Sequence, residues 1–429
     1  MVTLEFKIEW EAGPGVMAPP LRETWARFEI HSSDRVISLF WSESTKSLRN
    51  GVYGSLFPVA RWIVSNWWDL LCEGIPNPAV LNGARAGCPQ YDWIRRHNLF
   101  FGREGMALPD LTIFREEAGH ALIWWRDPHN TAISGRFMDD GVARVSSRAV
   151  EDGLTELVER VLARVDSMTD EAVQELRDDW TAVKESKGEE RDLCERLAAL
   201  GLDPYAPREA SIEDRVAALD LQGPLLRDFL AATGVDRIDT DLLVVRSLLN
   251  EMPPPRTAQS ACASPAPPVV VSELPYLAGY QRAEALRRKL SIPSDQPVQD
   301  LTKLLDDLSG TPDLSWVNGS QGRIEAVVQT GPHRSMAAHS RSNRGRRFLL
   351  ARALHHWEFG SATESSPRLI TSSRDWPQAC SRAFAAELLA PAAALRAAQE
   401  EWEDVETLAA RFDVSTMVIQ HQITNHAIE

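Results

Sequence analysis

The residues best suited to chemistry gather between Gly331 and Trp357, where six arginines occur and no acidic residue. Because the whole chain carries a formal net charge of −15, this stretch is a strong local excess of positive charge. The planar fork of a guanidinium suits carboxylate and phosphate groups, so the stretch indicates an anion-binding pocket. The alternative is a solvated loop with an internal salt bridge from Arg352 to Glu387 or to another buried acid. The six are Arg334, Arg341, Arg344, Arg346, Arg347 and Arg352.

Side chains of the types that bind zinc lie in the same region. His355 and His356 are adjacent, so on a helix their side chains diverge by about 100°, and Cys380 near His356 would make a start with two ligands. Two ligands are too few for a catalytic zinc site. Arg352 stands four residues before His356 on the same helical face, where a permanent cation without a lone pair repels Zn²⁺. We therefore expect no metal and no cofactor; zinc held by His356, Cys380 and His355 is the alternative.

A second zinc-like string, EEAGHA, runs from Glu116 to Ala121. A zinc helix of the HExxH kind needs two histidines one turn apart, and here the first position is Glu116. The flanking residues 111–114 and 121–125 have the pattern of two strands, with a turn at Ala118 and Gly119 between them. We predict a hairpin, which cannot present a helical pair of ligands.

Composition bounds the class of protein. The 429 residues, 44% hydrophobic and 25% charged, are typical of a soluble globular chain of two or three domains. Five scattered cysteines without a CxxC pair argue against a disulfide framework and favour a reducing cytosol. The most apolar early run, 55–72, is too short and too polar to cross a bilayer. We expect a cytoplasmic protein that makes no membrane contact, and the net charge argues against wholesale nucleic-acid binding.

Hydrophobic periodicity divides the chain. Alternation predicts strands over 4–10, 35–41 and 111–114, whereas apolar spacing of three and four predicts a helix over 57–71 and more helices after 150. The tract MPPPRTAQSACASPAPP, 252–268, cannot pack into a core and predicts a linker. The expected segments are 1–150, a Trp-rich mixed α/β domain; 151–251, a helical region; 252–272, the Pro-rich linker; and 273–429, a second domain.

Tryptophan is concentrated near the N-terminus, with nine of the fourteen within the first 125 residues. Trp62, Trp67 and Trp68 could form an aromatic recognition surface. The alternative is a Trp-rich core, which we favour because large aromatic side chains dominate core burial.

Three ordered stretches carry a family resemblance: RFLLARALHH at 347–356, AFAAELLAP at 383–391 and LAARFDVS at 408–415. With the helix-like opening at 274–290, a second helix beginning near 297–301 and strand-like runs at 314–317 and 324–328, they resemble the ImmA/IrrE family of metallopeptidase-like proteins. The resemblance extends from residue 273 to the C-terminus. It implies an α+β chain whose C-terminal domain is zincin-like with a mostly helical end.

The departures from the family pattern fall on its chemistry. The resemblance implies an HExxH motif whose two histidines bind zinc and whose glutamate takes a proton from the metal-bound water. Here Arg352 stands at the first histidine position, Ala353 at the glutamate position, and only His356 remains. The family's third ligand, a glutamate, has no counterpart within 378–382. We therefore expect no catalytic residue, and a ligand-binding site formed by Arg347, Arg352 and His356.

The resemblance also implies a functional setting. Such domains are often encoded on bacterial mobile elements and act in stress or phage responses by cleaving or sensing a repressor. We expect a catalytically degenerate, regulatory or defence-linked protein that binds a protein partner, with a small anionic ligand possible. One alternative is an active zinc endopeptidase with a nonstandard site.

A second alternative is a DNA-binding regulator, because 408–428 resembles a helix-turn-helix. Its second helix offers amide and imidazole groups but no lysine or arginine, so we expect a structural use for this element and no nucleic-acid partner. The polar side chains are Gln420, His421, Gln422, Asn425 and His426.

Overall fold

The computed structural model describes residues 3–76, 89–116, 119–126, 135–253, 274–298, 300–309, 312–319, 322–331, 333–360, 366–400 and 404–428. Contacts divide the chain into two compact units. The N-terminal unit is Met1–Ile75 with Ala79–Ala218, and the C-terminal unit is Pro76–Pro78 with Leu219–Glu429. The predicted linker lies, from residue 254 onward, outside the described residues. No helix in the described ranges is both long and apolar enough to cross a membrane.

The strands of the N-terminal unit pair in three antiparallel groups within its described part. β2 pairs with β1, β3 and β6; β8 lies between β7 and β10; and β4 lies between β5 and β9. Buried and exposed residues alternate along β1, which confirms the predicted strand. The strands are β1 (Leu4–Trp10), β2 (Trp25–Ser32), β3 (Arg35–Val36), β4 (Phe40–Ser42), β5 (Ser47–Arg49), β6 (Val52–Ser55), β7 (Asp110–Glu116), β8 (Gly119–Trp125), β9 (Gly135–Phe137) and β10 (Gly141–Val145).

The predicted strand over 35–41 is wrong as one element, because β3 and β4 belong to different sheets. Ser38, between them, donates its hydroxyl to the Asn50 carbonyl (2.6 Å) and accepts the Ile30 amide (2.8 Å). A side chain that bonds to the backbone in this way replaces ladder hydrogen bonds and turns the chain.

The hairpin predicted around residue 118 is confirmed. β7 and β8 pair antiparallel, from Asp110 opposite Trp125 to Glu116 opposite Gly119; residues 117 and 118 lie outside the described part. The buried His120 places Nε2 3.1 Å from the Leu71 carbonyl oxygen. Glu116 and His120 therefore do not form a helical ligand pair.

The predicted helix over 57–71 is two helices, broken at Asn66. The Asn66 side chain donates to the Trp62 carbonyl (2.7 Å), and such local bonds compete with the helical ladder. The helices of this unit are α1 (Pro19–Glu23), α2 (Phe57–Ser65), α3 (Trp67–Cys72), α4 (Pro89–His97), η2 (Leu99–Gly102), α5 (Ser147–Arg164), α6 (Glu171–Glu185), α7 (Glu189–Ala199) and α8 (Ala210–Ala217).

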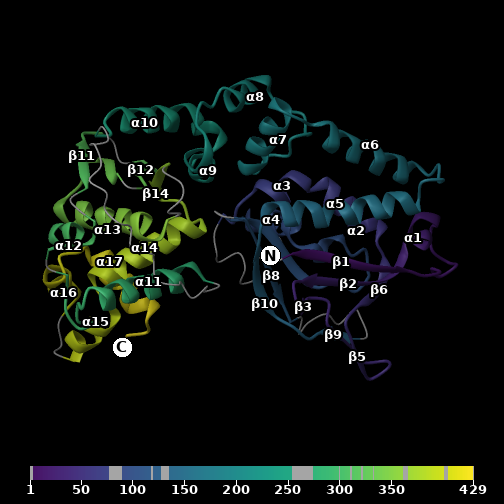
Figure 1. The fold of residues 1–429 in the computed structure, drawn as a ribbon, viewed down its shortest axis with the longest axis horizontal. Coiled ribbons are helices and arrows are strands. Elements are labelled where there is room, and N and C mark those ends of the chain that lie inside the picture. Colours follow the sequence, from purple (N-terminus) through teal and green to yellow (C-terminus); the bar gives the residue numbers. More distant parts are fainter. Residues whose placement is uncertain are drawn as a thin grey trace. The chain divides into compact units, whose positions relative to one another are not determined.

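The core of the N-terminal unit forms where α5 lies along β1 (Figure 1). A Cβ on Gly153 of α5 would approach the Leu4 carbonyl oxygen to 2.5 Å, so the glycine permits this close packing. Trp67 and Trp68 are 3% and 2% exposed and belong to this core, as the core interpretation expects. Trp62 is half-buried and donates its indole N–H to the Arg95 carbonyl.

The C-terminal unit has a mixed sheet of order β11-β13-β12-β14, in which β11 runs parallel to β13 and the other pairs are antiparallel. Its elements are α9 (Gly223–Ala232), η3 (Val235–Arg237), α10 (Ile238–Asn250), α11 (Pro275–Lys289), α12 (Leu301–Ser309), β11 (Asp313–Val317), β12 (Ile324–Gln329), β13 (Ser335–His339), α13 (Asn343–Phe359), β14 (Pro367–Thr371), α14 (Trp376–Leu389), α15 (Ala392–Glu400), α16 (Val405–Arg411) and α17 (Thr416–Asn425).

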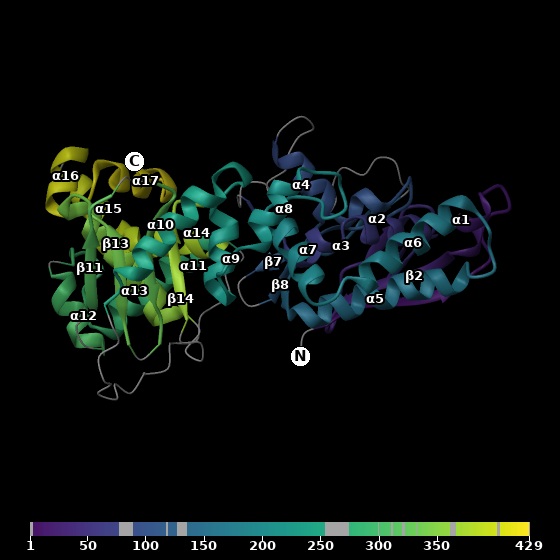
Figure 2. The ribbon, with the colours of Figure 1, turned by 90° about the horizontal axis from the view of Figure 1, so that it is seen from above.

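Helices cover both faces of this sheet (Figures 1 and 2), with α9 and α10 on one side and α13 and α14 on the other. Ala326 and Ile370 belong to the core under α13. Val327 and Leu369, their neighbours along the strands, point to the opposite face because strand side chains alternate, and both are fully buried. The α+β class and the helical C-terminal end agree with the sequence prediction.

The two compact units divide after Ala218, within the segment predicted as a helical region. Helices α9 and α10, from the segment predicted as a separate helical region, contact β14 and β12 of the C-terminal unit. Whether the four predicted segments fold independently is not tested by these contacts, so that division stays a prediction.

Candidate functional site

Helix α13 carries the residues that bear on zinc chemistry. Its N-cap, Ser342, accepts the Gly345 amide (3.2 Å) and so satisfies one of the free amides of the first turn. Every residue from Leu349 to Trp357 is buried. Because a helix enclosed on all sides cannot turn polar groups to water, its arginine and histidines need partners inside the protein.

The side chain of Arg352, 2% exposed, is bonded on several sides. Its Nη1 donates to Glu325 Oε2 at 2.5 Å. Its Nη2 donates to the Thr371 carbonyl at 2.8 Å and to Gln378 Oε1 at 2.6 Å. Its Nε donates to Ser381 Oγ at 3.2 Å. The guanidinium thus joins α13 to β12, β14 and α14.

Burial lowers the pKa of Arg352 to about 10, against the opposing effect of the Glu325 charge. The side chain is therefore a cation at neutral pH. Glu325 also accepts a salt bridge from Arg341 (3.1 Å), so its carboxylate lies between two guanidinium groups. The internal salt bridge considered from sequence is present, and its acid is Glu325 rather than Glu387.

Gln378 opens the stretch in which the family's third ligand has no counterpart. Its Oε1 accepts from the Thr371 amide (2.9 Å) as well as from Arg352, and its Nε2 donates to the Leu369 carbonyl (2.8 Å). The helix begins just before it, with Asp375 capping the Gln378 amide (2.9 Å). Both ends of the amide are used to attach α14 to β14.

His355 is engaged by a second arginine. Its Nε2 lies 2.7 Å from Arg282 Nη1 and 3.3 Å from Cys380 Sγ. Because a guanidinium only donates, His355 Nε2 accepts and the ring is neutral. Burial, followed by the Arg282 charge, holds the pKa of His355 well below its ordinary value.

Arg282 reaches this position because α11 packs very closely on α14. A Cβ on Gly279, one turn earlier in α11, would lie 2.5 Å from the Cys380 carbonyl oxygen and 2.7 Å from Ala383 Cβ. The guanidinium also lies 5.4 Å from the centres of the Phe359 and Trp376 rings, which favours a cation at this site.

His356 is buried, and its Nε2 has no hydrogen-bond partner within the described part of the chain. Burial lowers the pKa of His356 far below its ordinary value, and the charges of Arg368 and Arg352 act in the same direction. The His355 and His356 rings are 5.5 Å apart with planes at 86°, in line with the divergence expected of neighbours on a helix. His356 is thus a neutral imidazole whose Nε2 is unbonded within the described ranges.

The residues present do not fit a zinc ion. A guanidinium bonded to Glu325 and Gln378 stands at the first histidine position, and Ala353, at the general-base position, is buried in the apolar core. His355 Nε2 is taken by Arg282. The described ranges contain no group of three or more His, Cys, Asp or Glu residues placed to hold a metal.

Four of the six arginines in the stretch pair with acids outside it, and the other two bond to neutral groups. Arg334 pairs with Glu358, and Arg344 pairs with Asp413. Arg346 donates to Ser340 Oγ (2.6 Å) and lies 5.0 Å from the Trp316 ring centre. Arg347, half-buried, donates to the Val298 carbonyl. Acids elsewhere in the chain therefore offset part of the positive excess predicted from the sequence.

A buried ion pair near β14 was missed by the sequence analysis. Arg368 and Asp228, each 8% exposed at the side chain, form a two-fold contact of 2.8 and 2.9 Å, and Asp228 also accepts the Leu369 amide (2.9 Å). The one available signal was that Asp228 shares a face of α9 with Leu225 and Ala232, where an unpaired charge would be costly.

Three polar side chains near the C-terminus contact side chains of α14 and α11. Glu387 of α14 accepts from the Ala392 amide (3.1 Å) and from Gln422 Nε2 (2.8 Å). Asn425 donates to the Tyr280 hydroxyl (3.1 Å), and His426 lies 3.3 Å from Glu387. These contacts attach the end of the chain to α14 and α11.

Comparison with known families places this domain. Residues 332–424 match the family model described as the IrrE N-terminal-like domain, a segment that contains all three stretches on which the resemblance was based. The C-terminal domain is thus of the ImmA/IrrE type, and the recognition from sequence is confirmed. Searches of curated proteins and of solved structures returned no match.

Proposed function

We propose that this chain is a catalytically degenerate peptidase-domain protein that acts by binding, in a regulatory role. The observation that carries the proposal is the buried guanidinium of Arg352, bonded to Glu325 and Gln378 at the place where the family has a metal-binding imidazole. A fixed cation at this place opposes a second cation by direct Coulomb repulsion, most strongly in a site that water does not reach.

The loss extends beyond one ligand. Hydrolysis by this class needs a metal to acidify water and a carboxylate to accept its proton. The carboxylate position is Ala353, whose methyl group is fully buried. Loss of a general base alone typically lowers a rate by about 10²- to 10⁴-fold. The proposal is that the interior positions now stabilise the fold while the outer surface of the domain provides the function.

The setting of the proposal comes from the resemblance. ImmA/IrrE-type domains act in bacterial stress and phage responses, commonly from mobile elements, so the proposed partner is a protein of such a response. A small anionic ligand at Arg347, Arg352 and His356 is the lesser part of the proposal, since acids and carbonyls of the chain already bond to these arginines.

DNA binding by the last helices receives less support. Readout of bases needs free amide or basic groups on the second helix. Of the five polar side chains on this helix and at its end, Gln422, Asn425 and His426 contact Glu387 or Tyr280, whereas Gln420 and His421 are exposed. Salt-sensitive retention of the protein on DNA would nevertheless support the alternative function of a DNA-binding regulator.

Zinc content is the direct test. We expect the full chain, after incubation with zinc and dialysis, to retain well under one ion per chain, and its action on denatured casein to be nil with or without a chelator. The variant Arg352→His, which removes the cation and supplies an imidazole one turn from His356, should bind zinc more tightly than the wild type. A wild type that keeps about one zinc per chain and cleaves casein in a chelator-sensitive way would establish the active peptidase instead.

A further inference from the structure

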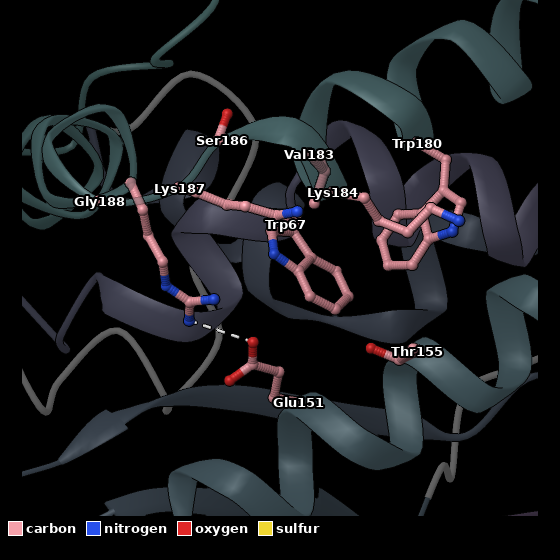
Figure 3. Close-up of a pocket in the computed structure, with 10 residues that line it drawn as sticks. Trp67, Glu151, Thr155, Trp180, Val183, Lys184, Ser186, Lys187 and Gly188 are labelled. Atoms are coloured by element: carbon pink, nitrogen blue, oxygen red, sulfur yellow. Dashed lines mark hydrogen bonds and ion pairs between the residues drawn. The ribbon is translucent and has the colours of Figure 1, made fainter.

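A pocket of about 310 Å³ opens in the N-terminal unit between α3, α5, α6 and the turn that leads into α7 (Figure 3). None of its lining belongs to the peptidase-like domain. Its volume is at the lower end of the range for small-molecule sites, about 300 to 1,000 Å³, so it suits a ligand of one or two rings.

Two indole rings form the apolar part of the pocket. Trp67 and Trp180 are each 3% exposed and meet edge to face, with centres 4.9 Å apart and planes at 75°. The indole N–H of Trp180 is buried and has no acceptor among the described residues. A buried donor without a partner is costly, and a ligand or water that accepts from it removes this cost.

Cations surround the rings. Arg191 is held by Glu151 at 3.1 Å and by Glu195 at 2.8 Å. Lys184 lies 5.8 Å from the Trp180 ring centre and pairs with Glu159 only at 3.7 Å, where both groups are exposed. Three cationic side chains thus line the pocket against one carboxylate, in a chain of net charge −15.

Lys187 is the cation best placed to meet a ligand. It is exposed and forms no ion pair or hydrogen bond with the part of the chain that the structure describes. Figure 3 shows its side chain extended across the pocket toward Trp67. The hydroxyl of Thr155, on the α5 side, adds a neutral donor and acceptor.

We infer that this pocket binds a small planar aromatic anion. The flat body lies against Trp67 and Trp180, the acidic group meets Lys187, and the ligand accepts from the free Trp180 N–H. The acid is a phosphate or a carboxylate, since lysine recognises either as a point charge.

Binding calorimetry on the full chain distinguishes the two acids. The probes are AMP, an aromatic phosphate, and indole-3-acetate, an aromatic carboxylate; adenosine and inorganic phosphate each lack one half of the predicted ligand. We expect one or both aromatic anions to bind with a Kd below about 1 mM and each half-ligand to bind at least about tenfold more weakly. Binding of AMP alone identifies a phosphate ligand, and binding of indole-3-acetate alone a carboxylate.

Two variants connect binding to the pocket. Lys187→Gln should lower the affinity for the probe by about fivefold or more. Trp180→Phe, which keeps a ring but removes the N–H, should also lower this affinity. Lys7→Gln, the same charge change on the exposed side of β1, should leave the affinity unchanged. The inference is overturned if neither aromatic anion binds at 5 mM, or if both pocket variants, folded by circular dichroism, bind as the wild type does.

Discussion

Arg352 shows how one buried guanidinium can hold several elements of a fold together. A zinc ion would hold its surroundings by attracting imidazole and carboxylate groups. The guanidinium instead holds Glu325, Gln378, Thr371 and Ser381 by donating to them. These elements converge on Arg352 because its guanidinium offers several donors in a plane.

Replacing Arg352 by methionine should therefore be strongly destabilising. Glu325 would lose the partner in its shortest ion pair while its carboxylate remained largely buried. Removal of one member of a buried ion pair typically costs about 3–5 kcal/mol. Arg344→Met is the matched control, because Arg344 and Asp413 are 41% and 56% exposed and such pairs contribute at most about 1 kcal/mol. Urea unfolding measures both; equal losses would mean that Arg352 is not the structural cation described above.

Asp69 predicts a pH effect in the N-terminal unit. Burial, with the Glu73 charge acting in the same direction and Arg96 opposing, raises the pKa of Asp69 to about 7. Between about pH 4 and pH 7 the folded state therefore binds this proton more tightly than the unfolded state, so the free energy of unfolding falls as pH rises through this window. Above about pH 7 Asp69 is ionised in both states, and its contribution to the free energy of unfolding no longer changes with pH.

Asp69→Asn should remove that contribution. The variant should be more stable than the wild type near pH 7.5, by on the order of 1–4 kcal/mol, and the difference should shrink toward about pH 5. Asp152→Asn, at a 70% exposed side chain of α5, serves as the control with no such trend. Urea unfolding at both pH values provides the comparison, and a parallel offset at the two pH values would argue against a raised pKa.

Among the helices, the contact of α11 with α14 decides where Arg282 and His355 meet. Glycine usually weakens a helix by about 1 kcal/mol relative to alanine. At Gly279, however, the facing atoms are the backbone oxygen of Cys380 and the Cβ of Ala383, which cannot move aside cheaply. An alanine at this position would therefore stabilise the protein through helix propensity but destabilise it through packing.

Gly279→Ala tests which of the two effects is larger. We expect a loss of about 1–3 kcal/mol, since insertion of a methyl group into a filled contact forces the backbones apart. Gln281→Ala, on the exposed side of the same helix, should change stability by about 0.5 kcal/mol or less. A stabilised Gly279→Ala variant in chemical denaturation would show that the helices are less closely packed than described.

For the C-terminal unit as a whole, residues on both sides of the Pro-rich tract contribute to one folded body. Asp228 of α9 compensates the buried charge of Arg368 and satisfies the Leu369 amide at the edge of the sheet. A fragment that starts after the tract would leave Arg368 without this carboxylate and uncover the face lined by Val327 and Leu369.

We therefore expect a fragment of residues 219–429 to unfold cooperatively and to be more stable than a fragment of residues 274–429 by about 3 kcal/mol or more. Asp228→Asn in the longer fragment should reproduce part of that loss, which separates the ion pair from the apolar burial. Equal urea midpoints for the two fragments would mean that α9 and α10 are not part of this folded body.

Much of the local structure could be predicted from the order of residues. Alternation along 4–10 and the hairpin around residue 118 depend on near neighbours in the chain, and so does the helix that bears Arg352. Two breaks were missed, at Ser38 and Asn66, because each depends on the bond that one side chain makes to the backbone.

The partners of the buried charges could not be predicted in this way. Arg352 bonds to Glu325, 27 residues away, and Arg368 to Asp228, 140 residues away. Which acid meets which arginine depends on strand register and on how closely helices approach, and periodicity does not encode either. The pocket at Trp67 and Trp180 likewise arises only where separate helices pack. A buried ring and a free lysine form a site only when the fold brings them close together.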